Sequence, residues 1–371
     1  MSLLPSIAII RYAEKATNLT GESSMNFYNN MHPYYCGIDL HARLLYVCII
    51  DNTGLILVHK KIKDDPEALL KLLKPYIGDI VVGVECMHCW YWVADFCKEH
   101  TIDFILGHAL YMKAIHGGKA KNDKIDSYKI AKLIRGGNFP LAYVYDKDMR
   151  ATRDLLRRRT KIVRHGADLK AHVANTASQY NLPAHNVNLK NVCDREKMRY
   201  YFPDPVVQRS INLNMAILDC YHSELKPLEH YIEQMAKQHN PVHLNILQTI
   251  NGIGRILALT IIYEIGDINR FSSVQKFASY SRLVKCKAES AGKTYGTQGN
   301  KIGNAHLKWA FSEAAVLLLR HNHNANKYLE KLQKRMSKAK ALSALAHKLG
   351  RCVYYMLKKE TVFDEAKFLK S

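Results

Sequence analysis

Four acidic residues in the N-terminal half of the sequence have the types and surroundings of a metal site. Asp39 lies in the apolar stretch GIDLH, and Glu85 ends the apolar stretch VVGVE. Asp123 and Asp126 follow in KNDKID, three residues apart, a spacing that puts both carboxylates on one face of a helix. Carboxylates are the hard oxygen ligands that Mg²⁺ or Mn²⁺ prefers, and two such ions can clamp the attacking and leaving oxygens of a phosphodiester.

The surroundings of these acids decide between a metal site and ordinary ion pairs. An unpaired carboxylate in an apolar strand costs several kcal/mol or becomes protonated, so Asp39 and Glu85 need a cation. Lys119, Lys121 and Lys124 surround the second pair of acids, and we expect these lysines to contact a nucleic-acid backbone. For any single acid, a solvated helix start with local ion pairs is the simpler interpretation. For all four acids together, a shared cation is favoured.

The segments that must position the acids follow an α/β order. Three β-like runs come first, with the turn DNTG joining the second and third; a helix-like segment follows, and then strand, helix and strand alternate. This order predicts an RNase H-like (RuvC-like) fold, in which the first strand lies at the sheet centre beside the strand that follows the first helix. Asp39 and Glu85 would then lie on neighbouring strands. The predicted strands are 34–40, 44–51, 55–62, 80–86 and 102–107, and the predicted helices are 66–77 and 89–100.

The charge of the chain points to a nucleic-acid partner. The 371 residues carry a formal net charge of +21, while the hydrophobic content of 48% is that of an ordinary globular protein with two or three domains. Such a surplus indicates a polyanionic partner and leaves the activity open. The apolar runs are far shorter than the ~20 residues of a bilayer span, so no membrane partner is expected. Residues 1–32 lack a basic leader, which predicts an N-terminal extension and a cytoplasmic protein.

The nine cysteines form no regular framework, which favours reduced thiols in a cytosolic protein. Cys86 and Cys89 form a CxxC pair, followed by Cys97 and His100. The sequence contains no second CxxC pair to complete a zinc site, so zinc is disfavoured. The role of Cys86 and Cys89 is left open.

The middle of the sequence is expected to be helical, with a basic run followed by apolar heptads. Cations far outnumber acids in the basic run, which favours a face that follows phosphates over an ordinary solvated face. Ile211, Leu218, Leu225 and Ile232 recur every seven residues, as in a short coiled coil interrupted at Pro227. The seam could pack within the chain or against another protomer. The predicted phosphate contacts are Arg153, Arg157, Arg158, Arg159, Lys161 and Arg164.

The C-terminal part begins with a glycine turn between two apolar helical patterns. Gly252 and Gly254 give it the pattern of a helix-hairpin-helix, whose backbone amides can approach a phosphate, although tight helix packing explains the glycines nearly as well. A segment rich in glycine, serine and lysine follows and returns to helix near residue 304. In it and in the helix after it, Lys293, Lys301 and Lys308 are expected to contact nucleic acid.

Two sets of motifs resemble the DEDD-type transposases of insertion sequence family 110, which includes the Piv-like DNA invertases. GIDLH, GVEC and KNDKID match the RuvC-like domain of that family. NGIGRILALTIIYEIGD, FASYSRLV, ESAGK and KIGNAHLKWAFSEAA match its C-terminal domain, in the same order along the chain. The resemblance covers residues 34–360.

This resemblance implies a recombinase that cuts and rejoins DNA with both halves of the chain. The catalytic and metal-binding acids of the family fall on Asp39, Glu85, Asp123 and Asp126, and its catalytic serine falls on Ser290 of AESAGK. In the family the serine attacks the phosphodiester and forms a covalent phosphoserine link to DNA. The resemblance also implies Mg²⁺ or Mn²⁺ as cofactor, donor and target DNA as substrates, a structured bridge RNA as guide, and a dimer that assembles into a tetramer.

Two other functions stay open on the sequence. A metal-only Holliday-junction resolvase or DNA invertase would use the same acids without Ser290, and a non-enzymatic nucleic-acid binder would use the charge alone. The expected regions are an N-terminal extension (1–32), a RuvC-like DEDD domain (33–144), a helical coiled-coil region (145–240), and a mostly α-helical transposase domain with a helix-hairpin-helix-like element and the serine (241–371).

Overall fold

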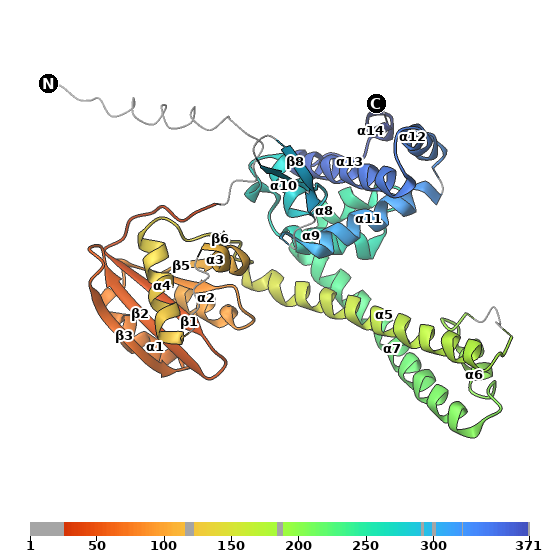
Figure 1. Ribbon diagram of the computed structural model, residues 1–371, viewed down its shortest axis with the longest axis horizontal. Coiled ribbons are helices and arrows are strands. Elements are labelled where there is room, and N and C mark those ends of the chain that lie inside the picture. The colour runs from red at the N-terminus through yellow and green to blue at the C-terminus, as the bar shows by residue number, and fades with distance from the viewer. Residues whose placement is uncertain are drawn as a thin grey trace. The chain divides into compact units, whose positions relative to one another are not determined.

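The protein divides into two compact units, Met1–Tyr143 and Val144–Ser371. Figure 1 shows the computed structural model, in which a mixed α/β unit is followed by a mostly helical one, as the sequence predicts. The finer division of the second unit stays a prediction. The structure describes residues 26–115, 122–183, 188–290, 293–298, 302–320 and 322–369.

A six-stranded sheet in the order β3-β2-β1-β4-β5-β6 forms the first unit. β1 pairs antiparallel with β2 and parallel with β4, which confirms the predicted neighbour of the first strand. β1, β2 and β4 are apolar along most of their length because both faces of the central strands are covered. The strands are β1 (Tyr34–Leu40), β2 (Leu44–Asp51), β3 (Ile56–Lys63), β4 (Ile80–Glu85), β5 (Asp103–Gly107) and β6 (Leu141–Ala142).

In the described residues of this unit, four α-helices accompany the sheet. α4 contacts β1, β2 and β4, so it packs on the centre of the sheet, and its Ile130, Ala131 and Ile134 enter the core (Figure 1). Asp65 caps α1 through the backbone amide of Ala68. The helices are α1 (Pro66–Leu73), α2 (Trp90–Glu99), α3 (Ala109–Ile115) and α4 (Asp123–Arg135), with a 3-10 turn at Lys74–Tyr76.

The second unit is built on two long helices and a bundle of shorter ones. α9 lies in the centre of the bundle, because its sequence RILALTIIYEI is apolar on every side and its residues from Leu257 to Ile265 are buried. A two-stranded hairpin, β7 (Cys286–Ser290) and β8 (Lys293–Gln298), precedes α11. The helices are α5 (Lys147–Gln179), α6 (Val192–Met198), α7 (Pro205–His239), α8 (Pro241–Gln248), α9 (Arg255–Ile265), α10 (Val274–Tyr280), α11 (Ala305–Arg320), α12 (His323–Gln333), α13 (Lys338–Lys359) and α14 (Glu365–Leu369), with a 3-10 turn at Ile268–Arg270.

The apolar heptads of the middle region pack within the chain. α5 and α7 run side by side in opposite directions and are joined through α6 (Figure 1). Val173 of α5 shares a buried cluster with Ile211 and Leu218 of α7, while Leu225 is only half-buried. α7 continues through Pro227 without ending. The choice that the sequence left open is therefore settled for Ile211 and Leu218 in favour of an intrachain contact.

Among the described helices, none combines the length and the apolar character that a bilayer span requires.

Candidate active site

β1, which carries Asp39, and α4, which carries Asp123 and Asp126, are in direct backbone contact. A Cβ atom on Gly37 of β1 would lie 2.5 Å from the backbone nitrogen of Ala131 in α4 and closer still to the carbonyl oxygen of Ser127. Only glycine allows this approach. His59 of β3 donates a hydrogen bond from Nε2 to the carbonyl oxygen of Lys124 (2.8 Å), which fixes the first turn of α4 on the sheet.

The first turn of α4 contains two of the acids, and a helix N-terminus stabilises such carboxylates. The side chain of Asn122 accepts a hydrogen bond from the amide of Lys124 and caps the helix. Asp123 and Asp126 occupy the first turn, where the positive end of the helix dipole stabilises carboxylates. Because α4 is held against β1, this first turn lies next to Asp39.

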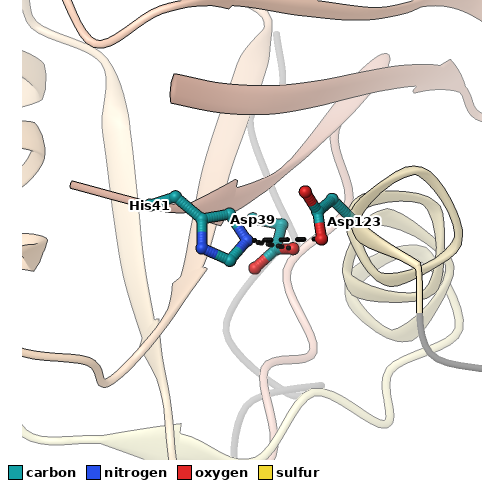
Figure 2. A group of neighbouring side chains, drawn as sticks. All are labelled: Asp39, His41 and Asp123. Atoms are coloured by element: carbon teal, nitrogen blue, oxygen red, sulfur yellow. Dashed lines mark hydrogen bonds and ion pairs between the residues drawn. The ribbon is translucent and has the colours of Figure 1, made fainter. Parts of the chain in front are cut away.

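Asp39, His41 and Asp123 form a cluster of potential metal ligands (Figure 2). His41 Nε2 lies 3.3 Å from Asp39 Oδ2 and 3.4 Å from Asp123 Oδ1, and one ligand atom of each residue lies within 4.8 Å of the others. His41 was not among the predicted site residues. Its signal was its position two residues after Asp39, a spacing that returns a side chain to the same face of a strand.

Electrostatics at the cluster favour a cation. Burial raises the pKa of Asp39, the charge and hydrogen bond of His41 lower this pKa, and the nearby carboxylates of Asp123 and Asp126 raise it again. Asp126 therefore contributes to the same negative field, although its Oδ1 is also paired with Lys129 Nζ at 3.2 Å. This concentration of oxygen donors, with one imidazole, fits a divalent ion such as Mg²⁺ or Mn²⁺.

Glu85 is placed beside Asp39 by the strand register. Val84 of β4 pairs with Ile38 of β1, and Glu85 and Asp39 each follow one member of that pair. Neighbouring positions on parallel strands direct their side chains to the same face of the sheet. Glu85 and Asp126 are not members of the three-residue cluster in Figure 2.

Ser290 is the last residue of β7, and its backbone pairs with Lys293 of β8. Its side chain lies outside the described part of the structure, so its role as nucleophile stays a prediction. Lys119, Lys121 and Lys301 also lie outside the described residues. Lys124, Lys293 and Lys308 are exposed to solvent.

The basic run of α5 is divided between inward and outward cations. Arg153 and Arg157 point to Glu264 of α9, with nitrogen–oxygen distances of 3.3 and 2.6 Å, and Arg159 pairs with Glu229 of α7 at 2.6 Å. These three arginines do not fit the predicted phosphate contacts, because their guanidinium groups are committed to carboxylates of their own chain. The cations of the run that remain exposed are Arg158, Lys161 and Arg164.

Gly252, the first glycine of the turn, allows close packing of the turn against α11. Gly252 has φ +99°, and a Cβ there would lie 2.5 Å from the backbone nitrogen of Leu318 in α11. The phosphate contact predicted for Gly252 does not fit this geometry, because the backbone of α11 occupies the space. Gly254 is exposed at the N-cap of α9, with no atom within 4 Å of its Cβ position.

The cysteines near the acids form no metal cluster in the described residues. Cys86 is exposed, Cys89 is half-buried and Cys97 is buried, and all three are free thiols. Burial raises the pKa of the Cys97 thiol to about 12, so this cysteine is an inert, protonated thiol at neutral pH.

Comparison with known proteins identifies the class to which this arrangement belongs. A family of DEDD transposases of the IS110 type matches residues 36–182, which contain all four acids. The family described as "Transposase IS116/IS110/IS902 family" matches residues 244–330, which contain the β7–β8 hairpin. Both matches define an insertion-sequence transposase.

Two relatives agree with these matches. The chain is 20% identical over 343 residues to the transposase for insertion sequence element IS1111A of Coxiella burnetii, which covers 88% of this chain and 90% of the relative. It is 24% identical over 213 residues to the putative transposase y4qE of Sinorhizobium fredii, covering 54% of this chain and 48% of the relative. The chain belongs to the IS110 family of DEDD transposases, and is therefore an enzyme that cleaves and recombines DNA.

Proposed function

We propose that this transposase cleaves and exchanges DNA strands with a divalent ion held by the acids of an RNase H-like first unit and with Ser290 as the nucleophile. The observation that carries the metal site is the convergence of Asp39 and Asp123 from two distant parts of the chain. Two carboxylates brought this close without a cation repel each other, and the burial that raises the pKa of Asp39 adds to that cost.

Each acid has a separate place in this proposal. Asp39 and Asp123 would hold the ion with support from His41, and Glu85 and Asp126 would complete the ligand set from the next strand and the same helix turn. Mg²⁺ or Mn²⁺, when bound there, would supply Lewis-acid stabilisation of the charge that develops on the phosphate.

Ser290 would attack the phosphodiester from the β7–β8 hairpin. A serine hydroxyl is a weak nucleophile at its ordinary pKa and needs a base or a metal site to accept its proton. The bond between the serine oxygen and phosphorus would form as a phosphorus–oxygen bond of the DNA strand breaks. The released strand oxygen would leave as a hydroxyl, and the phosphoserine link would keep the energy of the phosphodiester for rejoining. Rejoining would then need no ATP, and the sequence contains no GxxxxGK[ST] motif for binding nucleoside triphosphates.

The partners follow from the substrate. Donor and target DNA would lie along exposed cations such as Arg158, Lys161 and Arg164 of α5. A structured bridge RNA as guide, a dimer that assembles into a tetramer, and action at the bacterial nucleoid in the cytoplasm rest on the family resemblance. The division of the chain into four functional regions rests on the pattern of the sequence.

A denaturing gel tests the serine. Wild-type protein incubated with Mg²⁺ and its DNA ends should give a protein–DNA band that resists denaturation, and Ser290→Ala should lose both this band and strand exchange. Ser343→Ala is the matched control, because Ser343 is exposed on α13 and its hydroxyl donates to the carbonyl oxygen of Ala339 in the same helix.

The same experiment separates the rival functions. If Ser290→Ala keeps cutting DNA, the protein is a metal-only nuclease of the resolvase type, which the acid cluster alone would support. If Asp39→Asn cleaves and exchanges DNA strands as wild type does, the metal proposal is rejected. If Asp39→Asn and Glu85→Gln change nothing but the affinity for nucleic acid, a non-enzymatic binder is favoured.

A further inference from the structure

The two chain segments that flank the β7–β8 hairpin are bonded to each other. The backbone amide of Asn304 donates to the carbonyl oxygen of Tyr280 at 2.6 Å. Arg282 Nε donates to the carbonyl oxygen of Ile302 at 3.0 Å. We call these four residues the hairpin clasp, because they close the chain at the point where the hairpin leaves the helical bundle.

The clasp rests on a buried carboxylate. Glu264 of α9 has a side chain that is 3% exposed, and its Oε2 accepts a hydrogen bond from Asn304 Nδ2 at 2.7 Å. The same carboxylate accepts from Arg157 Nε at 2.6 Å and Nη2 at 2.8 Å, and from Arg153 Nε at 3.3 Å. Glu264 therefore joins α5, α9 and the clasp in one polar cluster.

This cluster is charged and satisfied. Burial raises the pKa of Glu264, but the hydrogen bond from Arg157, the charges of Arg153 and Arg157, and the hydrogen bond from Asn304 together lower it to about 2. The carboxylate is therefore ionised at any working pH. A buried charge with several charge-assisted hydrogen bonds has little freedom to move, because each bond is lost if the group shifts.

Asn304 transmits this fixed position to both sides of the hairpin. Its Oδ1 accepts hydrogen bonds from the amides of His306 (2.9 Å) and Leu307 (3.1 Å), which caps the start of α11. Its backbone holds Tyr280, and the Tyr280 hydroxyl lies 3.0 Å from that of Tyr145, close to the same cluster. One asparagine thus ties the end of α10, the start of α11 and Glu264 together.

We propose that Glu264 is a positioning residue for strand transfer: through Asn304 it fixes the clasp and so holds the β7–β8 hairpin, with Ser290 at the end of β7, in its working position. The inference rests on the proposed role of Ser290. A two-stranded hairpin is marginal in water on its own, so its orientation depends on the anchor at its base. A misplacement of about 1 Å at a reacting group can cost about 100-fold in rate.

Two single variants, their double variant and one control test this. Glu264→Gln removes the charge and weakens the bonds to the arginines, whereas Asn304→Asp keeps the cap of α11 and sets a second carboxylate against Glu264. Glu229→Gln is the matched control, because Glu229 holds Arg159 of the same helix α5 but makes no contact with the clasp. The reversed pair Glu264→Gln/Asn304→Asp can form an amide–carboxylate bond again and should rescue part of the effect.

The readouts are amide hydrogen exchange in β7 and β8, DNA affinity, and the rate of protein–DNA adduct formation at saturating DNA. In Glu264→Gln and Asn304→Asp we expect exchange in the hairpin to rise at least about tenfold. We expect the adduct rate to fall about 10–100-fold with DNA affinity unchanged. Glu229→Gln should change neither quantity.

Failure of this inference differs from failure of the proposed nucleophile. If wild-type protein forms no adduct, Ser290 is not the nucleophile, and hydrogen exchange alone decides whether Glu264 holds the hairpin. If Glu264→Gln does not fold, Asn304→Asp supplies the same comparison with the Glu264–arginine pairs intact. If folded variants show wild-type exchange in β7 and β8, the positioning role of Glu264 is overturned.

Discussion

Replacing Gly37 with alanine is expected to push α4 away from β1 and to weaken metal binding. The new Cβ would lie 2.5 Å from the nitrogen of Ala131, whereas ordinary van der Waals contact begins at 3.4 Å. The obstructing atoms are backbone, so the helix must retreat by about 1 Å, because a close-packed interior offers no free space. Overpacking of this kind lowers the free energy of unfolding by about 1–3 kcal/mol.

The consequence for the site follows from the short reach of metal bonds. Mg²⁺ takes its oxygen ligands at about 2.0–2.1 Å in a nearly fixed octahedron, so a shift of about 1 Å between Asp39 and Asp123 breaks the ligand set. Titration calorimetry with Mn²⁺ should show an affinity reduced at least about tenfold. A tenfold loss corresponds to roughly 1.4 kcal/mol of binding free energy, and the loss of one metal ligand is enough to cause it. Thermal unfolding of the same samples checks that the variant is folded.

Gly83→Ala is the matched control for this experiment. Gly83 pairs with Gly37 across β1 and β4, but its new Cβ would meet the terminal methyl of Ile134, which can rotate away. Gly83→Ala should therefore keep metal affinity. A folded Gly37→Ala protein that binds Mn²⁺ as tightly as wild type would contradict this prediction, and so would an equal loss of affinity in both variants.

Three further predictions concern the second unit. Gly252→Ala should lower the free energy of unfolding by more than about 1 kcal/mol, because it combines a positive φ with a backbone clash, whereas Gly254→Ala should be tolerated; equal stabilities in urea titrations would contradict this. The pKa of Glu264 is lowered from 4.5 in the unfolded chain to about 2 in the fold, so its ionised carboxylate stabilises the fold above pH 4.5. This stabilisation is lost as the pH falls towards about 2, and the difference in unfolding free energy between wild type and Glu264→Gln should shrink by about 3 kcal/mol across that interval. A difference in unfolding free energy that stays constant with pH would show that the charge of Glu264 is not the source of the stabilisation. Lys161→Ala should reduce the slope of log affinity for DNA against log salt by about 1, whereas Arg159→Ala, whose guanidinium is already paired with a glutamate, should not; filter binding at several salt concentrations distinguishes them.

The arrangement of the first unit could be predicted because it follows from patterns that are local in the sequence. Apolar runs of strand length, separated by turns and helices, fix the strand order once the first strand is placed at the centre. Asp39 and Glu85 then fall on adjacent strands, and the register of β1 and β4 agrees. The approach of Asp123 to Asp39 was predictable only as a requirement of the shared cation.

Other features of the site could not be predicted, because one sequence pattern serves two structural purposes. A run of arginines has the same composition whether it faces DNA or a buried carboxylate, and only the fold shows that Arg153 and Arg157 turn inward. Glu264 did carry a signal, since an acid inside the apolar stretch IIYEIG needs a partner, as Asp39 and Glu85 do. The contact of Gly252 with α11 joins residues too far apart in sequence for any local pattern.

The position of a bound Mn²⁺ ion in crystals of this protein, located by its anomalous scattering, is the most direct test of the metal proposal. We expect one peak between the carboxylates of Asp39 and Asp123, at about 2.0–2.6 Å from their oxygens. A crystal that contains Mn²⁺ bound elsewhere on the protein, with no peak between these two carboxylates, would contradict it.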